Sequence, residues 1–288
     1  MKKETFIILA AGFYSCALIY SSGSGTPYFS QIPELEPAII NVDSIIRTVH
    51  QIDNLEFPYV ENPDDIISHT GFSFFFNDAH KQSDWVVYML SRERLLNPVT
   101  KRKDNFRPDP AVKTGTATTA DYKGSGFDRG HLVPCSDMLW SKVAMDESFF
   151  FSNMSPHLAS FHQGGGIWYK LEDLVQIWAM EYDTLHIVAG PALKQGIRGR
   201  IGKNKVSVPE YFYKVILNYT ENRIEGIGFI MPHETKKSKN PVWNYAVSID
   251  SVQNFTGMDF FHKLPDIQEK YIESRLCESC WIWEKPKK

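Results

Sequence analysis

The chain has 288 residues, of which 43% are hydrophobic and 14% aromatic, so it can bury a large core and is not a disordered protein. Its formal net charge of -3 excludes a protein that coats nucleic acid through its whole surface, because such binding needs many Lys and Arg contacts to phosphates. Any site for a polyanion must therefore be local.

The first residues have the order of an export signal. Two lysines precede a mostly apolar run at 6–20, and small residues follow it. Because the run is shorter than the roughly 20 residues that span a bilayer, we expect a cleaved signal peptide over 1–25, with a retained N-terminal anchor as the alternative. Cys16 lies inside the run, so a bacterial lipoprotein that carries its lipid on this cysteine is a further alternative. The expected location is the periplasm or the exterior of a bacterial cell, with no stable membrane domain.

An acidic, proline-containing segment follows the expected signal. Between residues 31 and 68, eight Asp or Glu stand against one Arg. We interpret 26–68 as a solvated N-terminal extension with a short helix near 39–49.

A folded domain over 69–288 is predicted from the pattern that begins at Gly71. Phe72, Phe74 and Phe76 alternate with smaller residues, which is typical of a strand. Further strands are predicted at 85–90, 185–189, 205–208, 212–217 and 224–231, and helices at 165–182 and 267–276. Strands and helices without a regular alternation indicate an α+β fold.

Three cysteines lie beyond the expected signal. Cys277 and Cys280 form a C-x-x-C pair, for which a metal knuckle, a redox pair and a local disulfide are all open. A zinc site needs two further ligands, and the sequence offers no second pair. A structural or incidental pair is therefore the preferred interpretation.

The charge becomes locally positive between residues 91 and 113. Seven basic residues stand there against three acidic ones: Arg92, Arg94, Lys101, Arg102, Lys103, Arg107 and Lys113. A polyanion can be steered by such a segment, and an ordinary solvated loop is the alternative.

The segment 121–134 carries the clearest chemistry. Three glycines, Gly124, Gly126 and Gly130, allow the backbone to approach a ligand closely, and Asp128, Arg129 and His131 lie within four residues of one another. Hydrolysis of a phosphodiester needs a base for the attacking water, positive charge for the transition state, and a metal or an acid for the leaving oxygen. The segment supplies the first two.

Three ordered stretches carry a family resemblance: Gly-Phe-Asp-Arg-Gly-His-Leu at 126–132, Ser-Asn-Met-Ser-Pro at 152–156 and Ile-Trp-Tyr-Lys-Leu-Glu at 167–172. With them the chain resembles the DNA/RNA non-specific endonucleases of the ββα-metal (His-Me finger) superfamily, the Serratia-type and endonuclease G-like nucleases, from about residue 69 to 276. The resemblance implies a ββα-metal fold on a central, mostly antiparallel sheet with flanking helices. It also implies a hydrolase that cuts both DNA and RNA with a divalent metal, Mg²⁺ before Mn²⁺.

By position, the resemblance gives each motif residue a role. It makes His131 the base that activates water and Arg129 a stabiliser of the charged transition state, while Asp128 holds the motif. Glu172 matches the acid that orients metal-bound water, and Asn153 matches an asparagine that organises the site and is a second candidate ligand.

The chain departs from the family at the metal ligand. The family has an asparagine before the Trp-containing helix, where this chain reads Phe-His-Gln-Gly-Gly-Gly-Ile-Trp at 161–168. An alignment on the phenylalanine puts His162 in the ligand position, whereas counting back from the tryptophan puts Gly164 there. We prefer His162 because imidazole ligates divalent ions, with a leaning toward Mn²⁺ or Zn²⁺. His157 stands where the family usually has glutamine.

The family also has an upstream arginine and small apolar residues after the motif. For the arginine that contacts the phosphate, Arg102 is the preferred match and Arg107 the fallback. Cys135 and Ser136 replace small apolar residues and are expected to pack as such.

Two alternatives to an active nuclease remain open from the sequence. One is a catalytically impaired relative that still binds nucleic acid, and the other is a phosphodiesterase for small phosphate esters. The sequence does not determine the oligomeric state.

Overall fold

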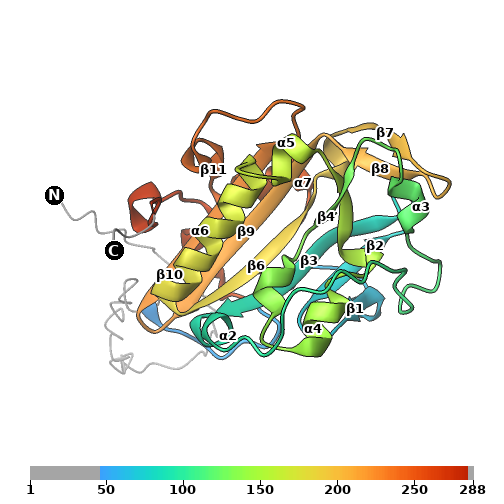
Figure 1. The fold of residues 1–288 in the computed structure, drawn as a ribbon. Coiled ribbons are helices and arrows are strands. Elements are labelled where there is room, and N and C mark those ends of the chain that lie inside the picture. Colours follow the sequence, from blue (N-terminus) through green and yellow to red (C-terminus); the bar gives the residue numbers. More distant parts are fainter. Residues whose placement is uncertain (1–45, 285–288) are drawn as a thin grey trace, which may run out of the picture. The chain divides into compact units, whose positions relative to one another are not determined.

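A seven-stranded antiparallel sheet forms the centre of the structure, a computed structural model that describes residues 46–284 (Figure 1). Every neighbouring pair in the sheet is antiparallel. In spatial order the strands are β1 (Ile66–Ser68), β2 (Ser73–Asn77), β3 (Gln82–Ser91), β6 (Thr184–Pro191), β9 (Tyr211–Thr220), β10 (Arg223–Pro232) and β11 (Ala246–Val247).

The central strands are buried on both faces. In β9, residues 212–219 are all buried, with Phe212 and Ile216 in one apolar cluster and Val215 and Leu217 in the other. Successive side chains of a strand point to opposite faces, so both faces of the sheet must be covered. This explains why these strands appear in the sequence as nearly continuous apolar runs.

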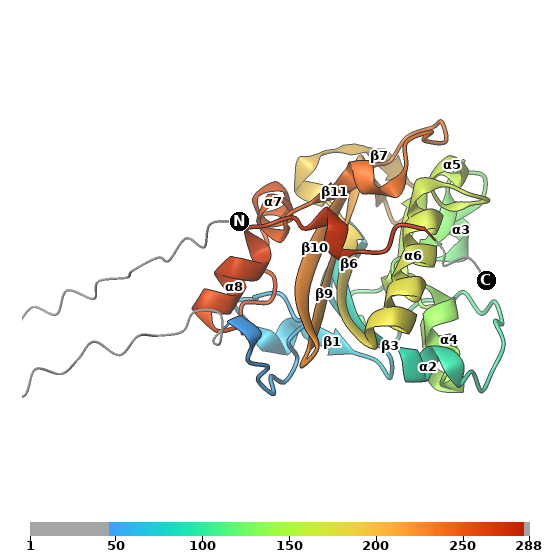
Figure 2. The ribbon, with the colours of Figure 1, turned by 90° about the vertical axis from the view of Figure 1, so that its left-hand side faces the viewer.

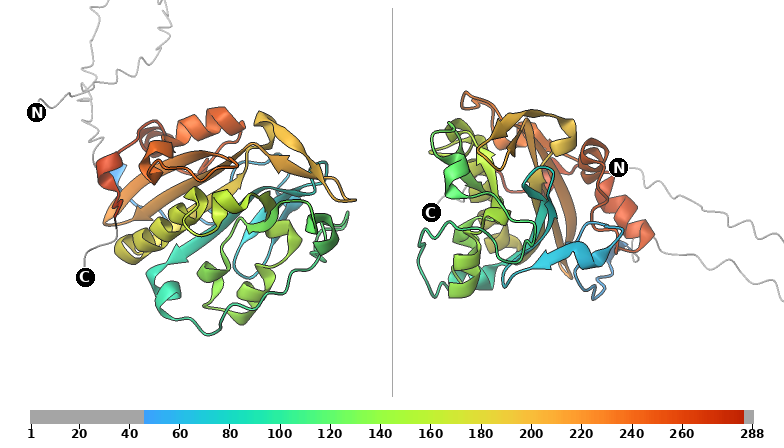
Figure 3. Two further views of the ribbon diagram at one scale, coloured as in Figure 1. Left: turned by 45° about the horizontal axis from the view of Figure 1, so that its top comes forward. Right: turned by 90° about the vertical axis from the view of Figure 1, so that its right-hand side faces the viewer.

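Helices cover both faces. On one side lie α2 (Arg92–Leu96), α3 (Thr119–Tyr122), α4 (Lys142–Glu147), α5 (Ala159–His162) and α6 (Ile167–Tyr182), and on the other α7 (Ile249–Thr256) and α8 (Asp266–Glu273) (Figure 2). The right-hand view of Figure 3 shows the same arrangement from the opposite side. Short 3₁₀ turns connect these elements: η1 (Pro63–Asp65), η2 (Cys135–Met138), η3 (Phe151–Asn153), η4 (Leu193–Gln195), η5 (Val242–Tyr245) and η6 (Glu278–Cys280).

Helix α6 is the main helix on its face. Its apolar side buries Trp168, Leu171, Val175 and Trp178, which recur at helical spacing. It begins after Gly166, where an added Cβ would lie 2.2 Å from the carbonyl oxygen of Phe161. The predicted helix at 165–182 and the predicted strands are confirmed, with their ends shifted by a few residues.

Two small antiparallel ladders complete the fold. Strands β4 (Asp128–His131) and β5 (Met154–His157) pair beside α6, and β7 (Ile197–Ile201) pairs with β8 (Val206–Pro209). The order β4, β5, α6 gives two strands followed by a helix on one face of the sheet. The α+β fold class with a central antiparallel sheet is therefore confirmed.

Part of the segment assigned above to a solvated extension belongs to the packed body. Strand β1 joins the edge of the sheet, and Leu55 is 2% exposed within the cluster under α7 and α8. The expected signal at 1–25 lies outside the described residues, as does most of the expected helix at 39–49.

Two further findings bear on the ends of the chain. Cys277 and Cys280 form a disulfide, which selects one of the three alternatives that the sequence left open. Within residues 46–284, no helix combines the length and the apolar character needed to cross a bilayer.

Candidate active site

Strand β4 carries the Asp-Arg-Gly-His segment and is held by its pairing with β5. Gly124 and Gly126, with φ of 71° and 82°, form the turn that leads into it. Gly130 pairs with Ser155, and a Cβ on Gly130 would lie 1.9 Å from the ring of His157. Glycine is therefore required here because the backbone of β4 rests directly on a buried imidazole.

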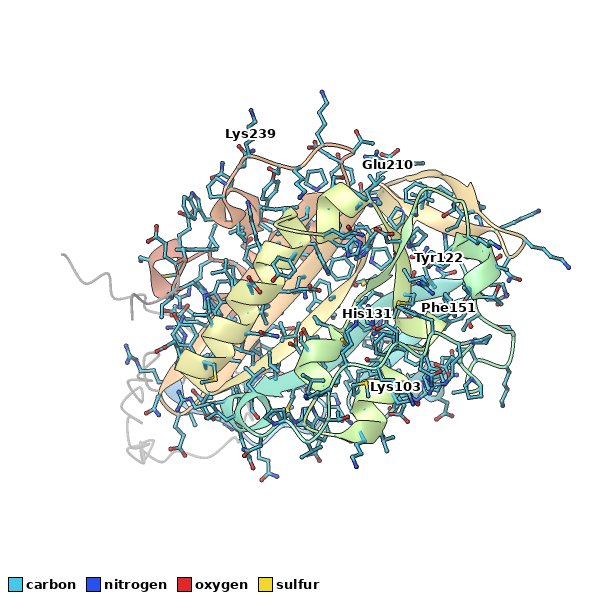
Figure 4. The ribbon with its side chains drawn as sticks, viewed as in Figure 1. Lys103, Tyr122, His131, Phe151, Glu210 and Lys239 are labelled. Atoms are coloured by element: carbon cyan, nitrogen blue, oxygen red, sulfur yellow. A yellow bond between two sulfur atoms is a disulfide. The ribbon has the colours of Figure 1, made fainter. Side chains whose placement is uncertain are left out.

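His131 is partly buried at the end of β4, on the α6 side of the sheet (Figure 4). Its ring packs edge-on against Phe106 and Phe149, at centroid distances of 5.7 and 4.9 Å. Its Nε2 is buried and has no hydrogen-bond partner within the described residues. Burial, followed by the charge of Arg102, lowers the pKa of His131 to about 3. The imidazole is therefore neutral across the physiological range.

The two predicted arginines lie around this imidazole. The Arg129 guanidinium stacks over Phe106 at 3.9 Å, and the Arg102 guanidinium lies 5.3 Å from the ring centroid of Phe149, which also touches His131. Arg102 also donates to the Sγ of Cys135 at 3.6 Å and pairs with Asp104. The buried cysteine therefore does more than fill space.

Arg107, the fallback, is occupied elsewhere. Its guanidinium pairs with the Asp146 carboxylate at 2.6 Å, donates to two backbone carbonyls and stacks on Phe150 at 4.0 Å. The geometry thus favours Arg102, which is 55% exposed, as the arginine that can reach a phosphate.

Asp128 and His162 form a hydrogen-bonded pair. The Nε2 of His162 lies 2.9 Å from Asp128 Oδ2, which also accepts a hydrogen bond from Gln163 at 2.8 Å. When the Nε2–H donates to the carboxylate, the Nδ1 lone pair is left for a cation. A carboxylate behind a histidine in this way is the usual support of a metal ligand. Asp128 thus joins β4 to the residues at the end of α5.

Asn153 does not fit the role of a ligand. Its side chain is fully buried, its Oδ1 accepts from the Val133 amide at 2.9 Å, and its Nδ2 donates to the carbonyls of Val133 and Ser148. These bonds fasten the loop that leaves β4 to the loop that precedes β5. The metal assignment of Asn153 is thus corrected, because a side chain sealed inside and bonded at both ends cannot reach an ion at the surface.

Glu172 lies one turn after Trp168 on α6. Burial raises its pKa to about 7, and the ammonium of Lys214 opposes the rise, while Asp137 adds to it. Lys214 is fully buried on β9, and Asp137 is 3% exposed on η2. Neither Lys214 nor Asp137 was predicted as a site residue from the sequence, although a lysine inside the apolar run 212–217 is a detectable signal.

The residues present suit a cation held by few protein groups. Within residues 46–284, the only three His, Cys, Asp or Glu side chains whose ligand atoms lie within 4.8 Å of one another are Glu225, Cys277 and Cys280, and both thiols of that group are in the disulfide. No preformed cage therefore surrounds His162. A Mg²⁺ or Mn²⁺ ion that keeps several waters needs no such cage.

Residues 51–267 match the family described as DNA/RNA non-specific endonuclease. The chain is 35% identical over 187 residues to mitochondrial endonuclease G of Homo sapiens, a match that covers 61% of this chain and 62% of that protein. It is 30% identical over 231 residues to mitochondrial nuclease EXOG of Danio rerio, covering 75% and 66%.

Two further comparisons agree. Nuclease C1 of Cunninghamella echinulata var. echinulata is 30% identical over 213 residues, covering 69% of this chain and 84% of that protein. The crystal structure of an EndoG/EndoGI complex, described as showing the mechanism of EndoG inhibition, superposes with a TM-score of 0.64 at 22% identity. It covers 78% of this chain and 92% of that one, and at this identity it shows the shared fold. The chain belongs to the DNA/RNA non-specific endonuclease family.

Proposed function

We propose that the protein is a metal-dependent, sugar-non-specific endonuclease that hydrolyses phosphodiester bonds in DNA and RNA. The observation that carries the proposal is the neutral imidazole of His131, lying on β4 among two arginines and near the Asp128–His162 pair. The family match supports the substrate class.

His131 is proposed to be the general base. An imidazole that is unprotonated at neutral pH is in the state that a general base needs before it takes the proton of an attacking water. The hydrogen bonds of Asn153 with Val133 and Ser148 keep β4 rigid. The His131 ring therefore holds its direction while the proton moves.

The arginines are proposed to bind the phosphate and to offset its growing negative charge. Arg129, at the centre of the motif, stacks on Phe106 and is thereby held in place. Arg102 stands in the exposed basic loop with Lys101 and Lys103, which suits a first contact with a polyanion. Figure 4 shows Lys103 below His131 in the view from the α6 side.

His162 is proposed to hold the cation through Nδ1, with Asp128 fixing the ring and Glu172 orienting bound water. A divalent metal bound there supplies positive charge to the phosphate and to the leaving oxygen. Mg²⁺ is the ion proposed first, and Mn²⁺ the ion that an imidazole ligand favours. The chain lacks the asparagine that ligates the metal in the family, which is the reason to consider an impaired enzyme. His162, held by Asp128, supplies another ligand and removes much of that reason.

Export from the cell is also a proposal, and it rests on the two lysines and the apolar run at the N-terminus. The relatives named above include mitochondrial proteins, so their location gives no support for it.

Cleavage assays on supercoiled plasmid and on a structured RNA, each with Mg²⁺, Mn²⁺ or EDTA, test the function. We expect both polymers to be cut with either metal and neither to be cut in EDTA. Binding without cleavage under every metal would mean an impaired relative. Faster turnover of a dinucleotide than of long DNA, with a weak salt dependence, would mean a phosphodiesterase for small esters.

A further inference from the structure

We propose that Lys214 is a positioning residue for Glu172: its buried ammonium lies beneath α6 and holds the Glu172 and Asp137 carboxylates in place. The inference rests on the proposed function for the role of Glu172. The interaction itself can be measured without any nuclease activity.

Lys214 is buried in an unusual way. It lies in the middle of β9, between Ala189 on β6 and Phe229 on β10, and its exposed fraction is 0%. Phe212 and Ile216, two residues away on either side, pack in the cluster under α6, so Lys214 points to the same face. The ammonium therefore lies between the sheet and the helix, on the site's side of the molecule.

The Lys214 ammonium has no hydrogen-bond partner among the described residues. It lies 4.6 Å from the ring centroid of Trp168, in a cation–π contact. An ammonium taken out of water is costly, and one aromatic face offsets only part of the cost. Opposite charges nearby must supply the rest.

Asp137 is the first of these charges. Its Oδ1 accepts a hydrogen bond from Gln176 at 2.7 Å and its Oδ2 accepts one from Tyr88 at 3.2 Å. Burial raises the pKa of Asp137, and the Lys214 charge acts against the rise.

On α6, Glu172 lies between the residue that contacts Lys214 and the residue that contacts Asp137. Trp168, four residues before it, touches Lys214, and Gln176, four residues after it, donates to Asp137. Residues four apart lie one above the other on the same face of a helix. The helix geometry thus places Glu172 above the lysine and the aspartate, and the opposing effects of Lys214 and Asp137 on its pKa agree.

The group has two carboxylates and one ammonium. Other charged or titratable neighbours that bear on it are Asp173 on α6, Tyr88 on β3 and His157 on β5. Without Lys214, Glu172 and the buried Asp137 would face each other with no cation between them, and one of them would take up a proton. Glu172 would then lose the charge with which it orients water at the proposed cation site.

If Lys214 served only for packing, its replacement by an apolar side chain of similar size would have little effect. Methionine has a similar length and no charge, and it fills irregular apolar space well. Removing one partner of a buried ion pair leaves the other charge uncompensated, whereas an apolar side chain of matched volume is tolerated where only packing matters. The substitution Lys214→Met therefore separates the charge of Lys214 from its volume.

The first measurement is the pH profile of kcat/KM for plasmid cleavage by the full chain with Mg²⁺. We expect Lys214→Met to lower kcat/KM at pH 7 by about 10–100-fold, the usual effect of removing a supporting group. Its acidic limb should move to higher pH, with KM nearly unchanged. In the double variant with Lys214→Met and Asp137→Asn, the acidic limb should move back to lower pH, because Glu172 is then the only carboxylate of the group. Asp137→Asn by itself should move the limb to lower pH, which keeps the test open if Lys214→Met does not fold.

The second measurement is a thermal-unfolding cycle without metal or substrate. Lys214→Met and Glu172→Gln should have non-additive effects on Tm, while Lys214→Met and Glu273→Gln, on opposite faces of the sheet, should add. Additive effects in the first pair, or an unmoved acidic limb in every variant, would overturn the inference. If the wild type cuts nothing yet the cycle is coupled, the proposed function fails and the Lys214–Glu172 interaction stands.

Discussion

Two glutamates lie on opposite faces of the same sheet, Glu172 partly buried and Glu273 buried, and the charges around them differ. Glu172, on α6, has the Lys214 ammonium among its neighbours, and burial raises its pKa only to about 7. Glu273, on α8, is 3% exposed and is surrounded by Glu269, Asp250 and Asp259; burial, followed by these charges, raises its pKa to about 9.

The difference in pKa separates a glutamate suited to catalysis from one with a structural role. A carboxylate whose pKa lies near neutrality can be charged when a substrate and a cation arrive, whereas one at about 9 is a neutral hydrogen-bonding group at pH 7. Glu273 accepts a hydrogen bond from Gln253 at 2.7 Å, which joins α8 to α7. Burial alone therefore does not mark a functional acid, and the sign of the neighbouring charges does.

The largest expected effect concerns the two glutamates themselves. Glu172→Gln should reduce kcat for plasmid cleavage by at least about 100-fold, because the amide cannot serve as the acid that orients water. Glu273→Gln, which has the same change of atoms on the other face, should leave kcat unchanged. A similar loss in both variants, measured under single-turnover conditions with Mg²⁺, would remove the distinction between the faces.

A pair of histidines extends the comparison. His162 lies 2.9 Å from Asp128 on the site face, and His186 lies 3.0 Å from Glu56 on the other face. Asp128→Asn should weaken Mn²⁺ binding by about 10–100-fold, since the carboxylate fixes the ring and its tautomer. Glu56→Gln is the matched control and should not change it. Electron paramagnetic resonance of free Mn²⁺ measures both affinities, and equal affinities in the two variants would reject His162 as the ligand.

The choice of metal should respond more mildly. His162→Asn should preserve cleavage and shift the preference from Mn²⁺ toward Mg²⁺ by a few-fold, because an amide oxygen is a harder ligand than imidazole. Rates at saturating Mg²⁺ and Mn²⁺ give the ratio. A folded variant that binds neither ion and cuts nothing would count against this assignment.

The smallest effect is on stability. Because Glu273 has a higher pKa in the folded chain than its ordinary 4.5, the folded state binds the proton more tightly. Its contribution is complete below about pH 4.5 and is lost as pH rises through about 9. Glu273→Gln should thus raise the free energy of unfolding at pH 9 by about 1–3 kcal/mol and do little at pH 5. Urea unfolding at both pH values checks this, and an equal shift at both would contradict it.

The fold was largely predictable because its strands and α6 carry strong periodic patterns. The runs at 185–189 and 212–217 and the stripe of Trp168, Leu171 and Val175 specify β6, β9 and α6 directly. Strand β1 was not predictable, since its three residues, Ile66–Ser68, are too short to show a period and follow acidic residues. The pairing of β4 with β5 is also set by contacts distant in sequence.

The site was only partly predictable. His131, Arg129 and Asp128 lie in one short segment, so their association was visible in the sequence. The choice of Arg102 over Arg107 needed the ion pair with Asp146, and the exclusion of Asn153 as a ligand needed its hydrogen bonds. These contacts are tertiary, and no local pattern encodes them.

The role of His131 as base is the central claim, and chemical rescue tests it most directly. His131→Ala should cut supercoiled plasmid at least about 100-fold more slowly than the wild type with Mg²⁺, and added imidazole should restore part of the rate in proportion to its unprotonated fraction. His262→Ala, on the other face, should match the wild type with or without imidazole. Cleavage by His131→Ala at the wild-type rate would contradict the account.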